Sequence, residues 1–130
     1  SMEEPVNLSW HQVTAPEEFE DVAFFVLEKD PDLVLLDVNL PGESGYDICS
    51  RIRAKSEVPI IFVTSRTDSM DELMGMLKGG DDYITKPFQL PILLARIAAV
   101  LKRAQEESLG MKDVGLTCLK MRLRFCIFSF

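Results

Sequence analysis

Polar side chains of three chemical types directly follow apolar segments of this sequence. The carboxylate of Asp37 follows LVLL, the hydroxyls of Thr64 and Ser65 follow IIFV, and the ammonium group of Lys86 follows DYIT. A carboxylate can accept a phosphoryl group as an acyl phosphate. Catalysis of that transfer consists mainly of positioning and of neutralising the phosphoryl oxygens, which Mg²⁺, a lysine and a hydroxyl can supply. These residue types therefore indicate phosphoryl transfer, provided that the fold brings them together.

Each of the three residues also has an ordinary explanation when it is taken alone. Asp37 is then a loop cap, Thr64 a strand-end hydroxyl bonded to the backbone, and Lys86 a solvated surface charge. All three, however, occupy the ends of successive apolar runs, and the turn-forming residues Pro41-Gly42 and Pro87 lie beside them. We therefore interpret them as one site.

The apolar runs predict the elements that position this site. Continuous runs without alternation, at 33–36, 58–63 and 83–84, are typical of strands that are buried on both faces of a parallel sheet. A further strand is expected at about 9–14, and segments with helical period lie between the strands. The order predicts an α/β domain with a doubly wound parallel sheet, in which ligands bind outside the carboxyl ends of the strands.

Length, composition and charge narrow the class of protein. A chain of 130 residues with 47% hydrophobic and 27% charged residues fits one globular domain. No apolar run is long enough for a membrane span and no signal-peptide pattern is present, so we expect a cytoplasmic protein without membrane contact. The net charge of −7 argues against a broad nucleic-acid surface. The three cysteines lack metal-ligand spacing and are expected to be free thiols.

Three segments, LLDVNLPGESGYD, PIIFVTSR and GGDDYITKPF, occur in an order that resembles the receiver domain of bacterial two-component response regulators. The OmpR/PhoB class is most similar, and the resemblance covers about residues 9–104. It implies a flavodoxin-like receiver domain over residues 1–107, followed by a tail over 108–130. It also implies that a sensor histidine kinase phosphorylates the chain to control transcription, and that DNA is bound only through an effector domain not present in this chain.

The resemblance also implies roles for individual residues. Asp37 would be the phosphoacceptor, the backbone carbonyl of Asn39 would bind Mg²⁺, Lys86 would contact the phosphoryl group beside a cis peptide bond before Pro87, and Thr64 would be the switch hydroxyl. In the same way, Tyr83 would be the aromatic side chain that turns inward with that switch. Two further residues, Asp82 and Arg96, would form an interface ion pair of a homodimer, although Ile92 stands where an acid is expected.

The chain departs from the family at its beginning. Receivers normally begin with a strand that ends in an acidic pair for Mg²⁺, followed by a helix, and neither is recognisable here. Glu3 and Glu4 resemble the acidic run that follows that strand and are candidate substitutes. Hard cations need several oxygen ligands at once, so we expect weakened Mg²⁺ binding and weakened phosphorylation.

The family's missing strand is central, and the tail offers a candidate to replace it. Residues 121–130, MRLRFCIFSF, have strand character with alternating apolar positions. This strand could run parallel into the central slot, exchange into a second molecule, extend a sheet edge, or be the start of an effector domain. The sequence leaves these alternatives open.

Two rival functions come from other classes. A degenerate receiver that binds a partner without phosphorylation would explain the missing acidic pair. A phosphatase of the haloacid dehalogenase type also uses a strand-end Asp, a Thr, a Lys and an acidic pair such as Asp81-Asp82. Against that phosphatase, residue 39 is Asn where an acid is needed, and Lys86 follows the acidic pair instead of preceding it.

Overall fold

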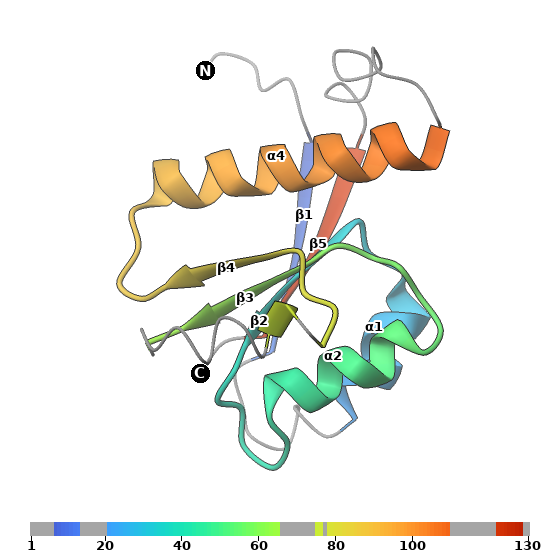
Figure 1. Cartoon of the computed structure of the whole chain (residues 1–130), viewed down its shortest axis with the longest axis vertical. Helices are drawn as coiled ribbons and strands as arrows, with labels where there is room; N and C mark the ends of the chain where they lie inside the picture. Colours follow the sequence, from blue (N-terminus) through green and yellow to red (C-terminus); the bar gives the residue numbers. More distant parts are fainter. Residues whose placement is uncertain (1–6, 14–20, 66–74, 77, 110–121, 129–130) are drawn as a thin grey trace.

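The computed structural model describes residues 7–13, 21–65, 75–76, 78–109 and 122–128. These residues form a parallel sheet with helices on both faces, which confirms the predicted fold class (Figure 1). The strands are β1 (Asn7–Val13), β2 (Leu33–Asp37), β3 (Ile60–Thr64), β4 (Asp82–Thr85) and β5 (Arg122–Phe128). The helices are α1 (Val22–Lys29), α2 (Gly45–Arg53) and α4 (Leu90–Leu109). The segment with helical period at 70–77 lies mostly outside the described residues.

The last described strand of the chain lies inside the sheet, whose order is β1-β5-β2-β3-β4. β5 pairs in parallel with β1 along its whole length, and with β2 from Leu33 opposite Phe125 to Leu36 opposite Phe128. Figure 1 shows β5 directly beside β1. Of the predicted alternatives for the tail, the structure therefore has the parallel strand between β1 and β2, within the same chain.

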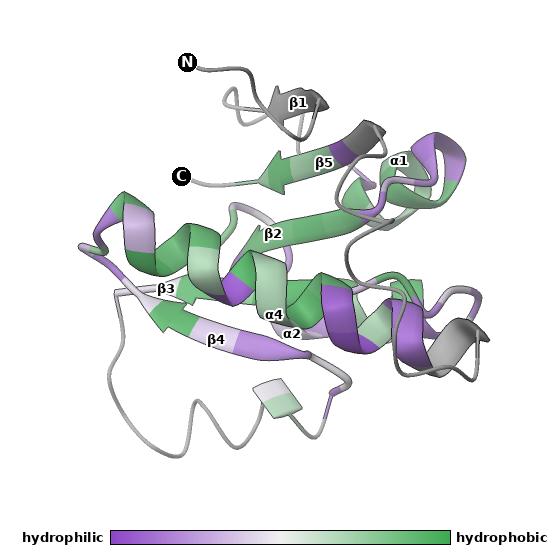
Figure 2. Ribbon diagram, turned by 90° about the horizontal axis from the view of Figure 1, so that it is seen from above, coloured by the Kyte–Doolittle hydropathy of each residue, from purple (hydrophilic) through white to green (hydrophobic). Residues whose placement is uncertain are grey.

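Apolar side chains on the two faces of the sheet form two cores. One core lies under α1 and α2, and the other lies under α4 through Leu93, Ile97 and Val100. All residues of β2 and β3 are buried, because both faces of these strands are covered, and Figure 2 shows their hydrophobic character. The continuous apolar runs from which a parallel sheet was predicted therefore correspond to these two buried strands.

Helix α4 continues to Leu109 and thus extends across the predicted domain boundary after residue 107. Its inward positions pack on the sheet, while Leu90, Ile92 and Leu94 are exposed. None of the helices in the described part of the chain is long and apolar enough to cross a membrane.

The residues of β5 are anchored on both faces and at the beginning of the strand. Cys126 and Phe128 belong to the core under α1 and α2, and Phe125 belongs to the other core. The ring of Phe128 meets Phe25 of α1 edge to face, with the centroids 5.7 Å apart.

At the start of the strand, the guanidinium of Arg124 donates to the carbonyls of Lys29 and Asp30 at the C-terminal end of α1. The backbone of Arg124 makes two hydrogen bonds with Asp32. The Asp32 side-chain Oδ2 accepts the Arg124 N–H at 2.7 Å, and the Asp32 N–H donates to the Arg124 carbonyl at 2.7 Å.

Candidate functional site

Asp37 and Lys86 meet at the carboxyl-terminal edge of the sheet. Asp37 is the last residue of β2 and is 3% exposed, and Lys86 follows the end of β4. The Nζ atom of Lys86 donates a hydrogen bond to Asp37 Oδ2 over 2.9 Å. The parallel strands carry both residues to the same edge, so a buried carboxylate faces an ammonium group that is partly open to solvent.

The loop after β2 fixes the orientation of the Asp37 carboxylate. Its Oδ1 accepts the backbone N–H of Asn39 at 2.9 Å. The chain on either side is held as well, because Val38 donates to the Val63 carbonyl at 3.1 Å and Gly45 donates to the Val38 carbonyl at 2.7 Å. Both carboxylate oxygens of Asp37 thus accept hydrogen bonds. Residues 38–44 line a hollow of about 410 Å³ beside this loop.

Gly45 is a structural residue of the site that the sequence analysis missed. A Cβ at this position would overlap the backbone oxygen of Asp37 and lie 2.9 Å from Val38 Cα. Only glycine therefore lets the start of α2 approach the end of β2 this closely. The available signal was Ser44, whose hydroxyl accepts the Asp47 N–H at 3.2 Å as the N-cap of α2, directly before a glycine.

Thr64 lies at the same edge as Asp37 and Lys86. It is the last residue of β3, it is fully buried, and its carbonyl accepts the backbone N–H of Lys86 at 2.7 Å. The peptide bond between Lys86 and Pro87 is cis, as expected from the resemblance. The structure therefore brings the three predicted residues to neighbouring strand ends, and their chemical roles remain predictions.

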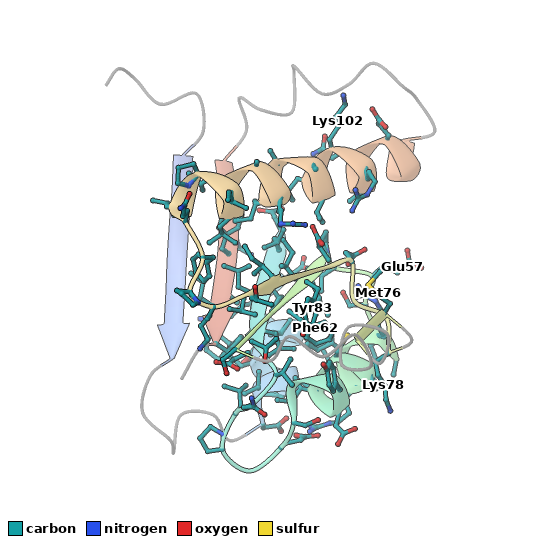
Figure 3. The ribbon with its side chains drawn as sticks, turned by 60° about the vertical axis from the view of Figure 1, so that its left-hand side comes forward. Glu57, Phe62, Met76, Lys78, Tyr83 and Lys102 are labelled. Atoms are coloured by element: carbon teal, nitrogen blue, oxygen red, sulfur yellow. The ribbon has the colours of Figure 1, made fainter. Side chains whose placement is uncertain are left out.

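Tyr83 lies beside the core, two positions before the end of β4. Its side chain is partly buried, packs against the core under α1 and α2, and comes from the β4 position that pairs with Phe62 of β3. Figure 3 shows the two labelled side chains close together. The predicted switching role of Tyr83 needs a second conformation and stays a prediction.

Asp82 and Arg96 form an ion pair within the chain. The Nη1 atom of Arg96 on α4 lies 3.3 Å from Asp82 Oδ1 at the start of β4. Asp82 Oδ1 also accepts the backbone N–H of Tyr83 at 2.8 Å. The pair borders a depression of about 580 Å³ that is lined by Tyr83, Ile84, Thr85, Pro87, Phe88, Gln89, Ile92 and Arg96. Its predicted use between two chains remains untested.

The described residues do not by themselves fit a tight Mg²⁺ site. Asp37 supplies one carboxylate, whose oxygens already accept from Asn39 N–H and Lys86 Nζ. The described part of the chain holds no cluster of three or more acidic, histidine or cysteine side chains that could bind a metal. Glu3 and Glu4, the predicted substitutes, lie outside the described residues. Mg²⁺ has six oxygen ligands, of which several are usually waters, so one carboxylate and one backbone carbonyl would hold it only weakly.

The fold and the site together define a class of protein. A doubly wound parallel sheet presents a buried acid that contacts an amine at its carboxyl edge, where open α/β sheets bind their ligands. Residues 2–98 match the family described as the response regulator receiver domain. The chain therefore belongs to the response regulator receiver family, whose members are signalling modules.

Similar proteins agree with this assignment. The transcriptional regulatory protein AfsQ1 of Streptomyces coelicolor is 43% identical over 105 residues, which cover 81% of this chain and 47% of that protein. The DNA-binding response regulator MtrA of Mycolicibacterium smegmatis is 47% identical over 90 residues, which cover 69% of this chain and 40% of that protein. This chain thus spans less than half the length of these two relatives.

Solved structures show the same fold. The N-terminal domain of the nisin resistance regulator NsrR superposes with a TM-score of 0.60 and 30% identity. The superposition covers 73% of this chain and 97% of that domain. The predicted resemblance to two-component receivers is therefore confirmed by sequence and by structure.

Proposed function

We propose that Asp37 is the phosphoacceptor of this receiver and that a sensor histidine kinase is the donor. A carboxylate oxygen of Asp37 attacks the phosphorus of a phosphohistidine, the P–N bond breaks, and the histidine nitrogen leaves with the bonding pair and takes up a proton. The product is an acyl phosphate on Asp37. The contact between Asp37 Oδ2 and Lys86 Nζ carries this proposal, because the same ammonium group can neutralise the phosphoryl oxygens.

Thr64 and Tyr83 are the proposed switch that responds to this modification. The hydroxyl of Thr64 would bind a phosphoryl oxygen, and Tyr83 would move further into the core as Thr64 shifts. Their positions on the adjacent strands β3 and β4 support this coupling. A switch of this kind needs two discrete arrangements of packed side chains.

Receivers generally use Mg²⁺, and we propose that this chain binds it weakly through Asp37 and the Asn39 carbonyl. When bound, Mg²⁺ supplies positive charge at the phosphoryl oxygens. The small set of described oxygen ligands supports weak binding. We also propose that the protein acts in the cytoplasm and takes part in the control of transcription, as the name of the DNA-binding response regulator MtrA suggests.

A small phosphodonor such as phosphoramidate tests the proposal without a kinase. We expect the intact mass of the chain to increase by one phosphoryl group, more at high Mg²⁺ concentration, and the gain to be lost in Asp37→Asn. Asp47→Asn is the matched control, because Asp47 is an exposed acid on α2. No labelling of the folded chain at any Mg²⁺ concentration would overturn the proposal.

That negative outcome would favour a second function, namely an interaction module that works without phosphorylation. The lack of a cluster of three or more metal-binding side chains among the described residues is the observation that supports it. We also propose that two copies associate through the face formed by β4 and α4. On that face the apolar side chains of Phe88, Leu90 and Ile92 are exposed beside the Asp82–Arg96 pair.

A further inference from the structure

We propose that the groove between β1 and β2 is a strand-binding site that accepts β5 from a second copy of this chain as well as from its own. Two copies that exchange β5 reciprocally would form a dimer in which every groove is filled. The inference concerns the folding of the sheet and is independent of the phosphoryl chemistry at Asp37.

The contacts of β5 do not depend on the covalent connection of the strand. Its ladder partners are β1 and β2, at residues 7–13 and 33–36. Its side-chain and main-chain hydrogen bonds at Arg124 go to residues 29, 30 and 32. All of these partners precede β5 by about 90 residues or more, as the separation of 92 for Arg124 and Asp32 illustrates. A β5 strand from another copy would therefore find the same partners.

The groove recognises a particular extended segment. Phe125 and Phe128 are each 1% exposed and Cys126 is fully buried, so the groove selects side chains on both faces of the strand. At the start of the strand, the exposed carbonyl ends of α1 and the Asp32 carboxylate select Arg124 and its backbone N–H. A second copy of the chain has the identical β5 sequence, so its strand fits the groove as well as the chain's own strand does. Paired backbone groups add affinity along the strand.

Chain connectivity decides which copy fills the groove. Residues 110–121 join α4 to β5, and a short covalent connection raises the effective concentration of the chain's own strand to roughly a millimolar. The chain's own strand therefore prevails in dilute solution. Strands from second copies compete when chains refold together near that concentration, or when the chain's own strand is defective.

Complementation between two full-length variants tests the inference. Phe125→Asp places a charge on a buried position of β5, so this variant has a defective strand and an intact groove. Val34→Asp places a charge on a buried position of β2, so this variant has a defective groove and an intact strand. We expect each variant alone to lose its cooperative thermal transition. After joint refolding at equal amounts, the groove of the first takes the strand of the second, so up to half of the chains regain the transition and a one-to-one complex appears by native mass spectrometry.

The matched control adds Phe125→Asp to the Val34→Asp partner, which removes the intact strand and must abolish the recovery. This control also separates strand exchange from association through the face of β4 and α4. A mixture whose signal equals the sum of its two components overturns the inference.

A second measurement covers the case in which either variant folds alone. Val34 pairs with Cys126 in the register of β2 and β5, so Val34→Cys places two thiols side by side. With Cys49 and Cys118 replaced by serine, refolding at rising concentration followed by oxidation should give disulfide-linked dimers whose fraction increases with concentration. Dimers must disappear when Cys126 is also replaced by serine, and protein that stays free of linked dimers at every concentration counts against the exchange.

Discussion

Lys86 Nζ lies 2.9 Å from Asp37 Oδ2, although 49 residues separate the two in the sequence. The Asp37 side chain is 4% exposed and the Lys86 side chain is 29% exposed. The ammonium group is therefore a close cationic neighbour of this buried carboxylate. This relationship connects the stability of the domain to its proposed chemistry.

Lys86→Met should lower both stability and phosphorylation. A buried carboxylate that loses a charged hydrogen-bond donor is destabilised, and we expect the free energy of unfolding to fall by about 1–3 kcal/mol. Urea denaturation measures the fall, and phosphoramidate labelling should slow at least tenfold. Lys102→Met on the exposed side of α4 is the control and should change neither quantity. Equal stability of the Lys86 and Lys102 variants would show that the ion pair contributes nothing measurable.

Gly45→Ala should displace the loop that follows Asp37 through steric overlap. The added Cβ overlaps the Asp37 carbonyl, so the loop must shift, and overpacking of this kind costs about 1–3 kcal/mol. Gly42→Ala is the comparison, because Gly42 has no atom within 4 Å of an added Cβ but has φ +92°. Both variants lose stability, whereas we expect only Gly45→Ala to reduce labelling of Asp37. Equal labelling of the two variants would contradict the role given to Gly45.

The buried thiols predict a loss of stability at alkaline pH. Burial raises the pKa of Cys126 from 9.0 to about 11, against the lowering effect of Arg124 and Lys29, and burial raises the pKa of Cys49 to about 11 as well. Between pH 9 and 11 the unfolded thiols lose protons that the folded thiols keep, so stability is fully present below pH 9 and falls as the pH rises through that window. Urea denaturation across this range measures the fall. The Cys49→Ala, Cys126→Ala double variant should show a smaller fall, and equal pH dependence of the two proteins would refute the prediction.

The proposed dimer predicts an effect of the Asp82–Arg96 pair on association. If the pair supports the face formed by β4 and α4, Asp82→Ala should weaken dimerisation by up to about fivefold, as expected for a partly exposed ion pair. Sedimentation equilibrium measures the dissociation constant. Asp47→Ala on α2 is a control on the other side of the sheet, and an unchanged constant in Asp82→Ala would remove the pair from the interface.

Much of the site could be predicted from the sequence because local patterns determine it. Buried parallel strands require continuous apolar runs, and the residue that follows each run must emerge at one edge of the sheet. That rule located Asp37, Thr64 and Lys86. The cis peptide bond before Pro87 was expected from the family resemblance instead. Gly45 was missed because its reason is a close approach between backbones, which spacing alone does not reveal.

The position of the tail could not be decided from the sequence. An apolar, alternating segment suits a central slot, a sheet edge or a second chain equally well. The contacts that decide between them are long-range, namely Arg124 with the end of α1 and Phe128 with Phe25. The same limit applies to Asp82 and Arg96, which face each other within the chain because α4 crosses beside β4.

The place of β5 between β1 and β2 has a consequence for biosynthesis. During translation, β1 and β2 emerge from the ribosome more than 80 residues before the strand that joins them, as the register of Leu33 with Phe125 shows. At ordinary elongation rates this delay is on the order of ten seconds. Throughout that interval the nascent chain exposes two unpaired strand borders, which are sites for chaperone binding and for aggregation. The yield of native protein in the cell should therefore depend on translation speed and on chaperone supply more strongly than its final stability suggests.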